Sequence, residues 1–458
     1  MKTFRPYQPD QLLLLPPSIQ EWLPEGHLAR FVSEVVDALD LAAIEDRYTE
    51  ERGYPPYHPR MMTKLLVYGY CSGTYSSRRI AAKLVDDVAY RYLAAENRPD
   101  FRTISDFRKE HGAALSGLFE QVLKLCRKAG LVKLGRVAVD GTKIKANASK
   151  HKAMSYERMQ SKARDLEREV REMLDRAEAT DREEDARFGP DRSGDELPVE
   201  LQRRESRLKK IREAMAELEA EAREQAQRDA EAAQQRNAER ERRQQRRGPQ
   251  FGGPASRVPD PAQTTPAPKA QRNFTDPESK VQKTADGFIQ GYTSHIAVDE
   301  HAQVIVAQHV TPQAPEVQHL LPAIDAIRNV LGRKPKQVLA DAGFWSEANV
   351  RELGRRRIEA FIARGRRKHD DSLPAAPRGR PPANLTIEQR MQRKLATKRG
   401  RKIYARRKSV VEPVHGQIKQ ARGFRQFLRR GLERVGQEWA LVCAAHNLLK
   451  LWRAQAIA

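Results

Sequence analysis

Three acidic residues have positions that could serve catalysis. Asp140 follows the apolar run 137–139, Asp341 follows the apolar run 338–340, and Glu412 is a lone acid within the basic stretch YARRKSVVEPVHGQIK, residues 404–419. Three carboxylates in one cleft repel one another unless a cation lies among them, and hard oxygen ligands suit Mg²⁺ or Mn²⁺. Two such ions about 3.5–4 Å apart can stabilise the attacking and leaving oxygens of an in-line phosphoryl displacement.

The bases around Glu412 suggest why a single carboxylate lies there. Arginine and lysine side chains beside it would hold DNA phosphates, which fix register but do not read sequence. These candidates are Arg406, Arg407, Lys408 and Lys419. Lys143, near the first acid, either contacts the DNA backbone as well or is simply exposed to solvent. Glu412 and Lys419 are two helical turns apart and share a face. Because Pro413 suits a first helical turn, we expect Glu412 at a helix start.

Each acid also has a simpler explanation when it is taken alone. Asp140-Gly141 is a common turn pair, and Asp341 precedes Ala-Gly in a similar way. Glu412 could be a surface ion-pair partner. Asp299 is a rival second acid because it also ends an apolar run, but DEHA separates two strand-like runs, so we assign Asp299 to a hairpin turn. The combination of three acids in this order favours the catalytic interpretation.

The elements that must position these residues form several parts. Residues 1–130 have apolar side chains at helical spacing, which predicts an N-terminal all-α domain. Ser76 and Ser77 predict a helix start with Arg78 and Arg79 in its first turn. This arrangement fits either a DNA-binding helix-turn-helix-like bundle or a helical bundle that only packs on its neighbour.

Residues 131–150 and 273–458 predict a mixed α/β sheet with helices on its faces, since short apolar strands alternate with amphipathic helices. The intervening residues 151–247 are highly charged and carry apolar residues in steps of three and four, on both sides of a break at FGPDRSGDELP. This pattern predicts an antiparallel coiled-coil hairpin. Residues 248–272 are rich in Pro and Gly and are expected to be a disordered linker.

Composition limits the class of protein. The formal net charge is +23, concentrated in 351–430, which favours a nucleic-acid partner. Three widely spaced cysteines argue against a disulfide framework or a zinc site and fit a reducing cytosol. No apolar run approaches the roughly 20 residues that a membrane span needs. The four-leucine run near the N-terminus is followed by prolines and does not form a signal peptide. We therefore expect a cytoplasmic location.

The motifs AVDGTKIKANAS, VLADAGFWSE and YARRKSVVEPVHGQIK resemble those of bacterial insertion-sequence transposases of the DDE type, closest to the eleven-eighty-two insertion-sequence family. The resemblance covers nearly the whole chain. The third motif is similar to the Tyr-Arg-Glu-Lys signature of that group, here Tyr404, Arg407, Glu412 and Lys419. Its basic residue usually lies four positions before the acid, where this chain has Lys408, so Arg407 and Lys408 both remain candidates for the signature contact.

The resemblance implies an RNase H-like catalytic core in which Asp140, Asp341 and Glu412 bind two Mg²⁺ ions, with Mn²⁺ as a substitute. It implies cleavage at the element's terminal inverted repeats and attack of the exposed 3′-OH on target DNA, without a covalent protein–DNA intermediate. Synapsis of two DNA ends implies a homodimer.

Phe344 and Trp345 either stack on an unpaired base or, as their usual role in proteins favours, pack under the loop.

Other functional classes stay open at this stage. One is an RNase H-like nuclease or resolvase that cuts DNA without joining it. Another is a catalytically silent, domesticated DNA-binding protein, and a third is a scaffold built on the coiled-coil insertion.

Overall fold

In the computed structural model, the described residues are 18–49, 55–188, 199–249, 253–284, 287–312, 316–365 and 376–455. The leucine run near the N-terminus and most of the predicted break at FGPDRSGDELP lie outside them. The chain divides into two compact units, one made of residues 1–145 and 292–458 and the other of residues 146–291. The first 130 residues therefore share a unit with most of the residues assigned to the catalytic domain.

The first unit begins with helices, as expected. Helix α3 shows the local reasons, because Pro59 occupies its first turn, His58 accepts a hydrogen bond from Arg60 N, and Gly73 ends the helix with φ 79°. The elements are η1 (Ile19–Trp22), α1 (Leu28–Ala38), α2 (Ala42–Glu45), α3 (Pro59–Ser72), α4 (Ser77–Asp86), α5 (Val88–Ala94), α6 (Phe101–Glu110) and α7 (Gly112–Lys128).

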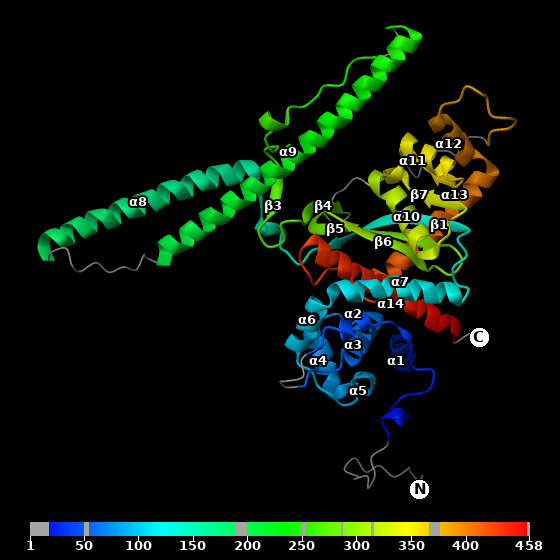
Figure 1. The fold of residues 1–458 in the computed structure, drawn as a ribbon, viewed down its shortest axis with the longest axis horizontal. Helices are drawn as coiled ribbons and strands as arrows, with labels where there is room; N and C mark the ends of the chain where they lie inside the picture. The colour runs from blue at the N-terminus through cyan, green and yellow to red at the C-terminus, as the bar shows by residue number, and fades with distance from the viewer. Residues whose placement is uncertain are drawn as a thin grey trace, which may run out of the picture. The chain divides into compact units, whose positions relative to one another are not determined.

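The main sheet has the strand order β4-β5-β1-β7-β8, and β6 also pairs with β5. Its strands are β1 (Arg136–Lys145), β4 (Lys280–Thr284), β5 (Gly287–Asp299), β6 (Ile305–Thr311), β7 (Gln337–Ala340) and β8 (Glu359–Ile362). Strands β1, β7 and β8 are parallel, whereas β4 and β6 run antiparallel to β5. Strand β5 crosses from one unit to the other, and β4 pairs with its first residues, 287–291. Figure 1 shows this mixed sheet.

The predicted hairpin turn at Asp299 is confirmed, and the Asp299 carboxylate has a structural role. Asp299 is 1% exposed, and its carboxylate accepts hydrogen bonds from the backbone N–H groups of Leu134 and His301 at 2.7 and 2.8 Å. Glu300 N then donates to Arg136 O, at the start of β1. These bonds fix the end of β5 against the beginning of β1, so this acid is fully used by the fold.

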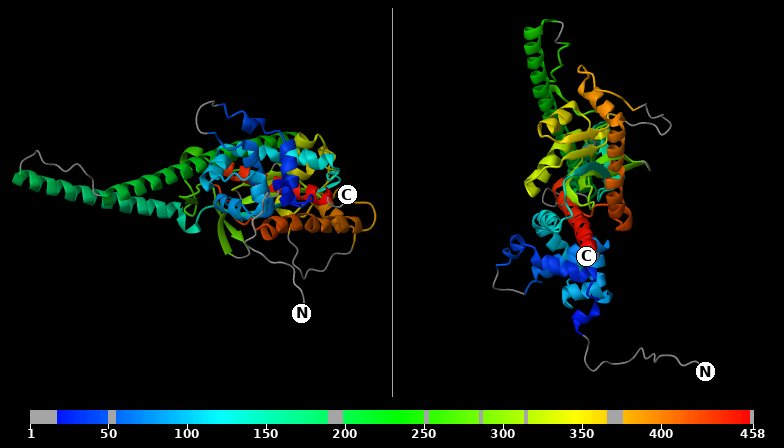
Figure 2. Two further views of the ribbon diagram at one scale, coloured as in Figure 1. Left: turned by 90° about the horizontal axis from the view of Figure 1, so that it is seen from below. Right: turned by 90° about the vertical axis from the view of Figure 1, so that its right-hand side faces the viewer.

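Several helices pack on the sheet of the first unit. Helix α13 contacts β1, β7 and β8, while α10 and α14 contact β6. Helix α14 also packs against α7 and α3, and it lies between the N-terminal helices and the sheet (Figures 1 and 2). These elements are η5 (Val317–His319), α10 (Leu320–Leu331), η6 (Ala342–Phe344), α11 (Glu347–Arg355), α12 (Ile387–Ala396), α13 (Lys398–Gly416), the π-helical turn η7 (Gln417–Ala421) and α14 (Leu432–Gln455).

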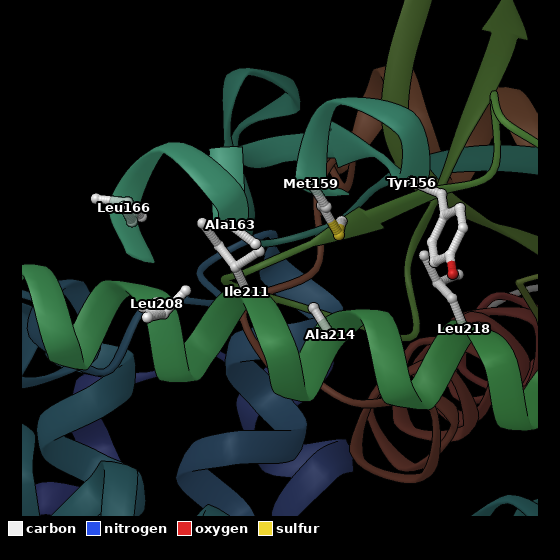
Figure 3. Close-up of a cluster of buried hydrophobic side chains, with 8 residues drawn as sticks. All are labelled: Tyr156, Met159, Ala163, Leu166, Leu208, Ile211, Ala214 and Leu218. Atoms are coloured by element: carbon white, nitrogen blue, oxygen red, sulfur yellow. The ribbon is translucent and has the colours of Figure 1, made fainter. Parts of the chain in front are cut away.

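The second unit contains two long helices, α8 (Tyr156–Phe188) and α9 (Val199–Arg247). They run antiparallel, because Tyr156 donates a hydrogen bond to Glu219 while Glu169 pairs with Arg204. Figure 3 shows the apolar residues between them, namely Tyr156, Met159, Ala163, Leu166, Leu208, Ile211, Ala214 and Leu218. The predicted helical hairpin is therefore present, and its seam includes the predicted residues Met159, Ala163, Leu166, Leu208, Ile211 and Leu218 together with Tyr156 and Ala214.

The stretch after the hairpin differs from the expected disordered linker. Residues 253–272 include η4 (Pro261–Gln263), which contacts α9, and β3 (Gln271–Asn273), which pairs with β2 (Ala153–Ser155) next to η2 (Lys150–Lys152). The amide of Asn237 exchanges hydrogen bonds with the backbone of Ser256 at 2.7 and 2.9 Å. The Pro/Gly-rich composition predicts a flexible segment because it reflects local propensity alone. In the structure, side chains of the long helix α9 form hydrogen bonds with the backbone of this segment.

Two expectations about the acids need correction. Asp140 is not at the end of β1, which continues to Lys145. Glu412 is not at a helix start either, since α13 begins at Lys398 and holds Pro413 inside its last turns. Proline inside a helix leaves the carbonyl four residues earlier without its donor. Here that carbonyl belongs to Ser409, and the Gln303 side chain donates to it at 3.1 Å.

Candidate active site

The pairing of β1 with β7 brings two of the predicted acids together. The last parallel pair is Val139 with Ala340, so the next residues are Asp140, within β1, and Asp341, directly after β7. Neighbouring strands lie about 4.8 Å apart, which places the two backbones side by side at the same end of the ladder. Asp341 then caps η6, and its Oδ1 accepts a hydrogen bond from Gly343 N at 2.9 Å.

Helix α13 supplies the side chains that face Asp140. Arg407 Nη1 lies 3.6 Å from Asp140 Oδ1, and His415 Nε2 lies 3.7 Å from Asp140 Oδ2. Burial raises the pKa of Asp140 to about 6; the Arg407 charge opposes this shift, and the charges of Asp341 and Glu412 add to it. The ion pair with Arg407 therefore offsets only part of the cost of burying this carboxylate among other acids.

The side chain of His415 is largely buried. Burial lowers its pKa to about 4, and the charge of Lys419 lowers it further. The imidazole is consequently neutral at pH 7, and neither ring nitrogen has a hydrogen-bond partner. His446, in contrast, is a core histidine that is 1% exposed and has a polar partner, because its Nε2 lies 2.9 Å from Gln303 O.

Glu412 has a weaker connection to the two aspartates. Its side chain is exposed, and its charge is the smallest of the causes that raise the pKa of Asp140. Among the side chains that the structure describes, no group of three or more His, Cys, Asp or Glu residues is arranged, as it stands, to hold a metal ion. The geometry thus joins Asp140 to Asp341 and leaves Glu412 further out.

Sequence reasoning missed a fourth acid, Glu316, which comes just before η5. A Cβ added to Gly141 would lie 2.5 Å from Glu316 Oε1, and a Cβ on Gly343 would clash with Oε2. Burial, together with the charges of Asp341 and Asp140, raises the pKa of Glu316 to about 7. Glu316 follows no apolar strand, so the strand-then-acid pattern could not find it.

Two of the remaining predicted residues, Lys419 and Tyr404, lie close to this site. Lys419 Nζ donates to Thr142 Oγ1 at 2.9 Å and to Lys143 O at 3.0 Å, so it holds β1 just beyond Asp140. Tyr404 is half-buried beside Arg407 and both aspartates, and burial raises its pKa.

The side chains of the other predicted residues have different surroundings in the described part of the chain. Arg406 pairs with Glu300 at 3.2 Å, and Lys408 is exposed. Trp345 is half-buried, whereas its neighbour Phe344 is fully buried against His295. Arg78 and Arg79 are exposed on the first turn of α4, well separated in sequence from the acidic site.

Comparison with known proteins gives matches to transposases. Residues 17–110 match a family described as "Transposase domain (DUF772)", and residues 381–452, which include Arg407, Glu412 and Lys419, match a family described as "Transposase DDE domain". The chain is also 35% identical over 89 residues to a Burkholderia cepacia protein described as "Putative transposase for insertion sequence element IS402".

That match covers 18% of this chain and 42% of the relative, so the chain spans less than half of the relative's length. No solved structure matches. The resemblance to bacterial insertion-sequence transposases of the DDE type is confirmed by these three matches. Within the described residues, no helix is both long enough and apolar enough to cross a membrane.

Proposed function

We propose that this protein is a DNA transposase with an RNase H-like catalytic domain. It would cleave strands at the ends of an insertion sequence and join the released 3′-OH to target DNA. The observation that carries the proposal is the pair Asp140 and Asp341, adjacent on parallel strands and facing the basic helix α13. The strand order β6-β5-β1-β7-β8, with three parallel strands, also fits an RNase H-like sheet.

Carboxylate oxygens are the type of donor that suits divalent cations. Asp140, Asp341 and Glu412 would bind two Mg²⁺ or Mn²⁺ ions, because carboxylate oxygens are the ligands these ions prefer. Such ions lower the pKa of water and neutralise charge that develops on phosphate oxygens. Gly141 and Gly343 have no side chains, so there is space beside the two aspartates. The carboxylate of Glu316 fills this space.

The side chains of this protein would orient the DNA and support that chemistry. Arg407 balances part of the acidic charge, and Lys419 fixes the strand that carries Asp140. Arg406, Lys408, Lys143 and Trp345 would contact the DNA near the cleaved phosphate. Catalysis by positioning and by charge stabilisation needs no tyrosine or serine nucleophile.

A separate DNA contact is proposed for the N-terminal helices. Arg78 and Arg102 lie 5.1 and 5.8 Å from the ring centroid of Phe101, which is 37% exposed, at the starts of α4 and α6. A cavity of about 470 Å³ opens beside them. Guanidinium groups at helix N-termini suit phosphate, so these residues with Arg79 would bind the terminal repeats, in a cytoplasmic homodimer that synapses two ends.

The test uses full-length protein, Mn²⁺ and DNA that flanks its own coding sequence. We expect strand cleavage and joining by the wild type and a loss of at least about 100-fold in Asp341→Asn, since catalytic charge stabilisation has this size. Asp86→Asn, at an exposed position in α4, should retain activity. Cleavage without joining would favour a nuclease or resolvase, and binding without cleavage would favour a silent DNA-binding protein.

A further inference from the structure

We infer that Glu316 is a fourth carboxylate of the acidic site and binds the same divalent cations as Asp140 and Asp341. This inference rests on the proposed metal-dependent function. It adds a ligand from the segment between β6 and α10, which lies outside the three motifs of the sequence and outside both matched families.

The first argument is the position of the Glu316 carboxylate. Oε1 lies 2.5 Å from the place where a Cβ of Gly141 would be, and Oε2 lies against the corresponding place on Gly343. Gly141 directly follows Asp140, and Gly343 is two residues after Asp341. One carboxylate thus reaches the backbone beside both aspartates, and it can do so only because both positions lack a side chain.

The second argument is that the fold does not use this carboxylate. In the described chain, no hydrogen bond or ion pair is found for the Glu316 side chain, and the charges of Lys143 and Arg407 act on it only through space. A half-buried carboxylate with a structural role is normally hydrogen-bonded or paired. Glu316 instead faces two other acids, an arrangement that a divalent cation would stabilise.

The third argument comes from His295, which points to the same place independently. His295 is 3% exposed, and neither of its ring nitrogens has a hydrogen-bond partner. Its Nδ1 lies 3.0 Å from the position that a Gly141 Cβ would take, beside Glu316 Oε1. His319, three residues after Glu316, stacks on this ring at a centroid distance of 4.8 Å.

An unpaired buried imidazole normally indicates a missing polar partner. An occupant that keeps several water ligands, as Mg²⁺ does, would supply that partner. The glutamate, the histidine and the two glycines therefore define one polar space beside Asp140 and Asp341, and a hydrated divalent cation has the charge and the hydrogen-bonding capacity that this space lacks.

The experiment measures Mn²⁺ binding to the full-length protein without DNA, by calorimetry and by the electron paramagnetic resonance signal of free Mn²⁺. Glu316→Gln should weaken Mn²⁺ binding by about 10-fold or more, on the scale of lost metal-site residues. Glu316→Asp, which keeps the carboxylate, should recover part of the affinity. Asp341→Asn is the positive control, and Glu120→Gln, at an exposed position in α7, should bind as the wild type does.

Thermal unfolding in a chelator separates a ligand from a structural residue. Without cations, Glu316→Gln should unfold at or above the wild-type temperature, because it removes a negative charge from an acidic cluster. A clearly lower unfolding temperature would overturn the inference, since it would show that the carboxylate stabilises the fold itself.

The binding data also separate this inference from the proposed function. If Asp341→Asn loses Mn²⁺ but Glu316→Gln binds it unchanged, Glu316 is not a ligand and the transposase proposal stands. If the wild type binds no Mn²⁺, or Asp341→Asn binds it equally well, both ideas fall.

Discussion

At the scale of single residues, Arg407 and Lys408 show how one position along a helix decides a role. The sequence left both as candidates for the contact with the acids. Arg407 is largely buried and lies 3.6 Å from Asp140, whereas Lys408 is exposed and has no such contact. A step of one residue turns a side chain by about 100° around the helix, so only one of the two can face β1.

This difference gives a residue-scale prediction. Arg407→Gln should lower the free energy of unfolding at pH 7 by about 1–3 kcal/mol, because it leaves Asp140 buried without its cation. Lys408→Gln should change it by less than about 0.5 kcal/mol. Urea unfolding of both variants in a chelator measures the effect, and equal losses would contradict the assignment.

The pH dependence of the arginine variant follows from the raised pKa of Asp140, about 6. Below that pH, Asp140 binds a proton in the native state and no longer needs Arg407. The loss in Arg407→Gln should therefore be smaller at pH 5 than at pH 7. A constant loss across this range would show that Arg407 acts mainly through packing.

At the scale of elements, the site depends on how α13 is held on the strands. Its first turn is attached to β8, because Arg399 donates two hydrogen bonds of 2.9 Å to the Glu359 carboxylate. Lys394 of α12 lies 3.2 Å from the same group, and Gln337 of β7 donates to it at 2.6 Å. One acid thus connects two strands to two helices.

Glu359 gives a prediction with a defined pH window. Partial burial alone would raise its pKa, but hydrogen bonds from Arg399, Gln337 and Lys394 outweigh burial and lower the pKa to about 2. A depressed pKa means that the native state favours the charged form, so the stabilisation is present above the unfolded value of 4.5 and is lost as the pH falls towards 2.

Glu359→Gln should consequently lower the free energy of unfolding by about 1 kcal/mol at pH 7, the upper size for a partly exposed ion pair. Urea titrations at pH 7 and near pH 2 should show the difference from wild type shrinking at the acidic pH. Glu347→Gln, which removes the exposed i,i+4 pair with Arg351, is the matched control and should have a smaller effect at both values.

At the scale of the whole first unit, α14 joins the N-terminal helices to the sheet. Its residues are buried on nearly all sides, and Asn447 is fully buried. The Asn447 amide pairs with the edge of β6, accepting from Ile305 N and donating to Ile305 O at 2.8 Å each. A helix side chain thereby satisfies two backbone groups that a further strand would otherwise bind.

Asn447→Ala should lower the free energy of unfolding of the protein by about 1–3 kcal/mol, since it leaves the N–H and C=O of Ile305 buried and unpaired. Hydrogen exchange should become faster in β6 and α7 together, because α14 contacts both. Arg453→Ala, at an exposed position on the same helix, should leave stability and exchange nearly unchanged. Faster exchange confined to β6 would contradict this joining role.

The sequence alone predicted most of the elements and the resemblance to transposases. Local sequence patterns predict the strand segments before Asp140 and Asp341, the helical N-terminus and the apolar seam of the hairpin. They also carry the resemblance to transposases. Hydrophobic periodicity reports which face of an element is buried, and short motifs keep their spacing, so neither needs knowledge of distant contacts.

Only the tertiary structure decided which side chains meet. The register Val139 with Ala340 aligns the two aspartates, and the glycines beside them admit Glu316 from another segment. The exposed position of Glu412 and the unpaired His295 also depend on packing among α13, β1 and β5. These features depend on strand register and on the absence of a side chain at two positions, which are properties of residues far apart in the chain.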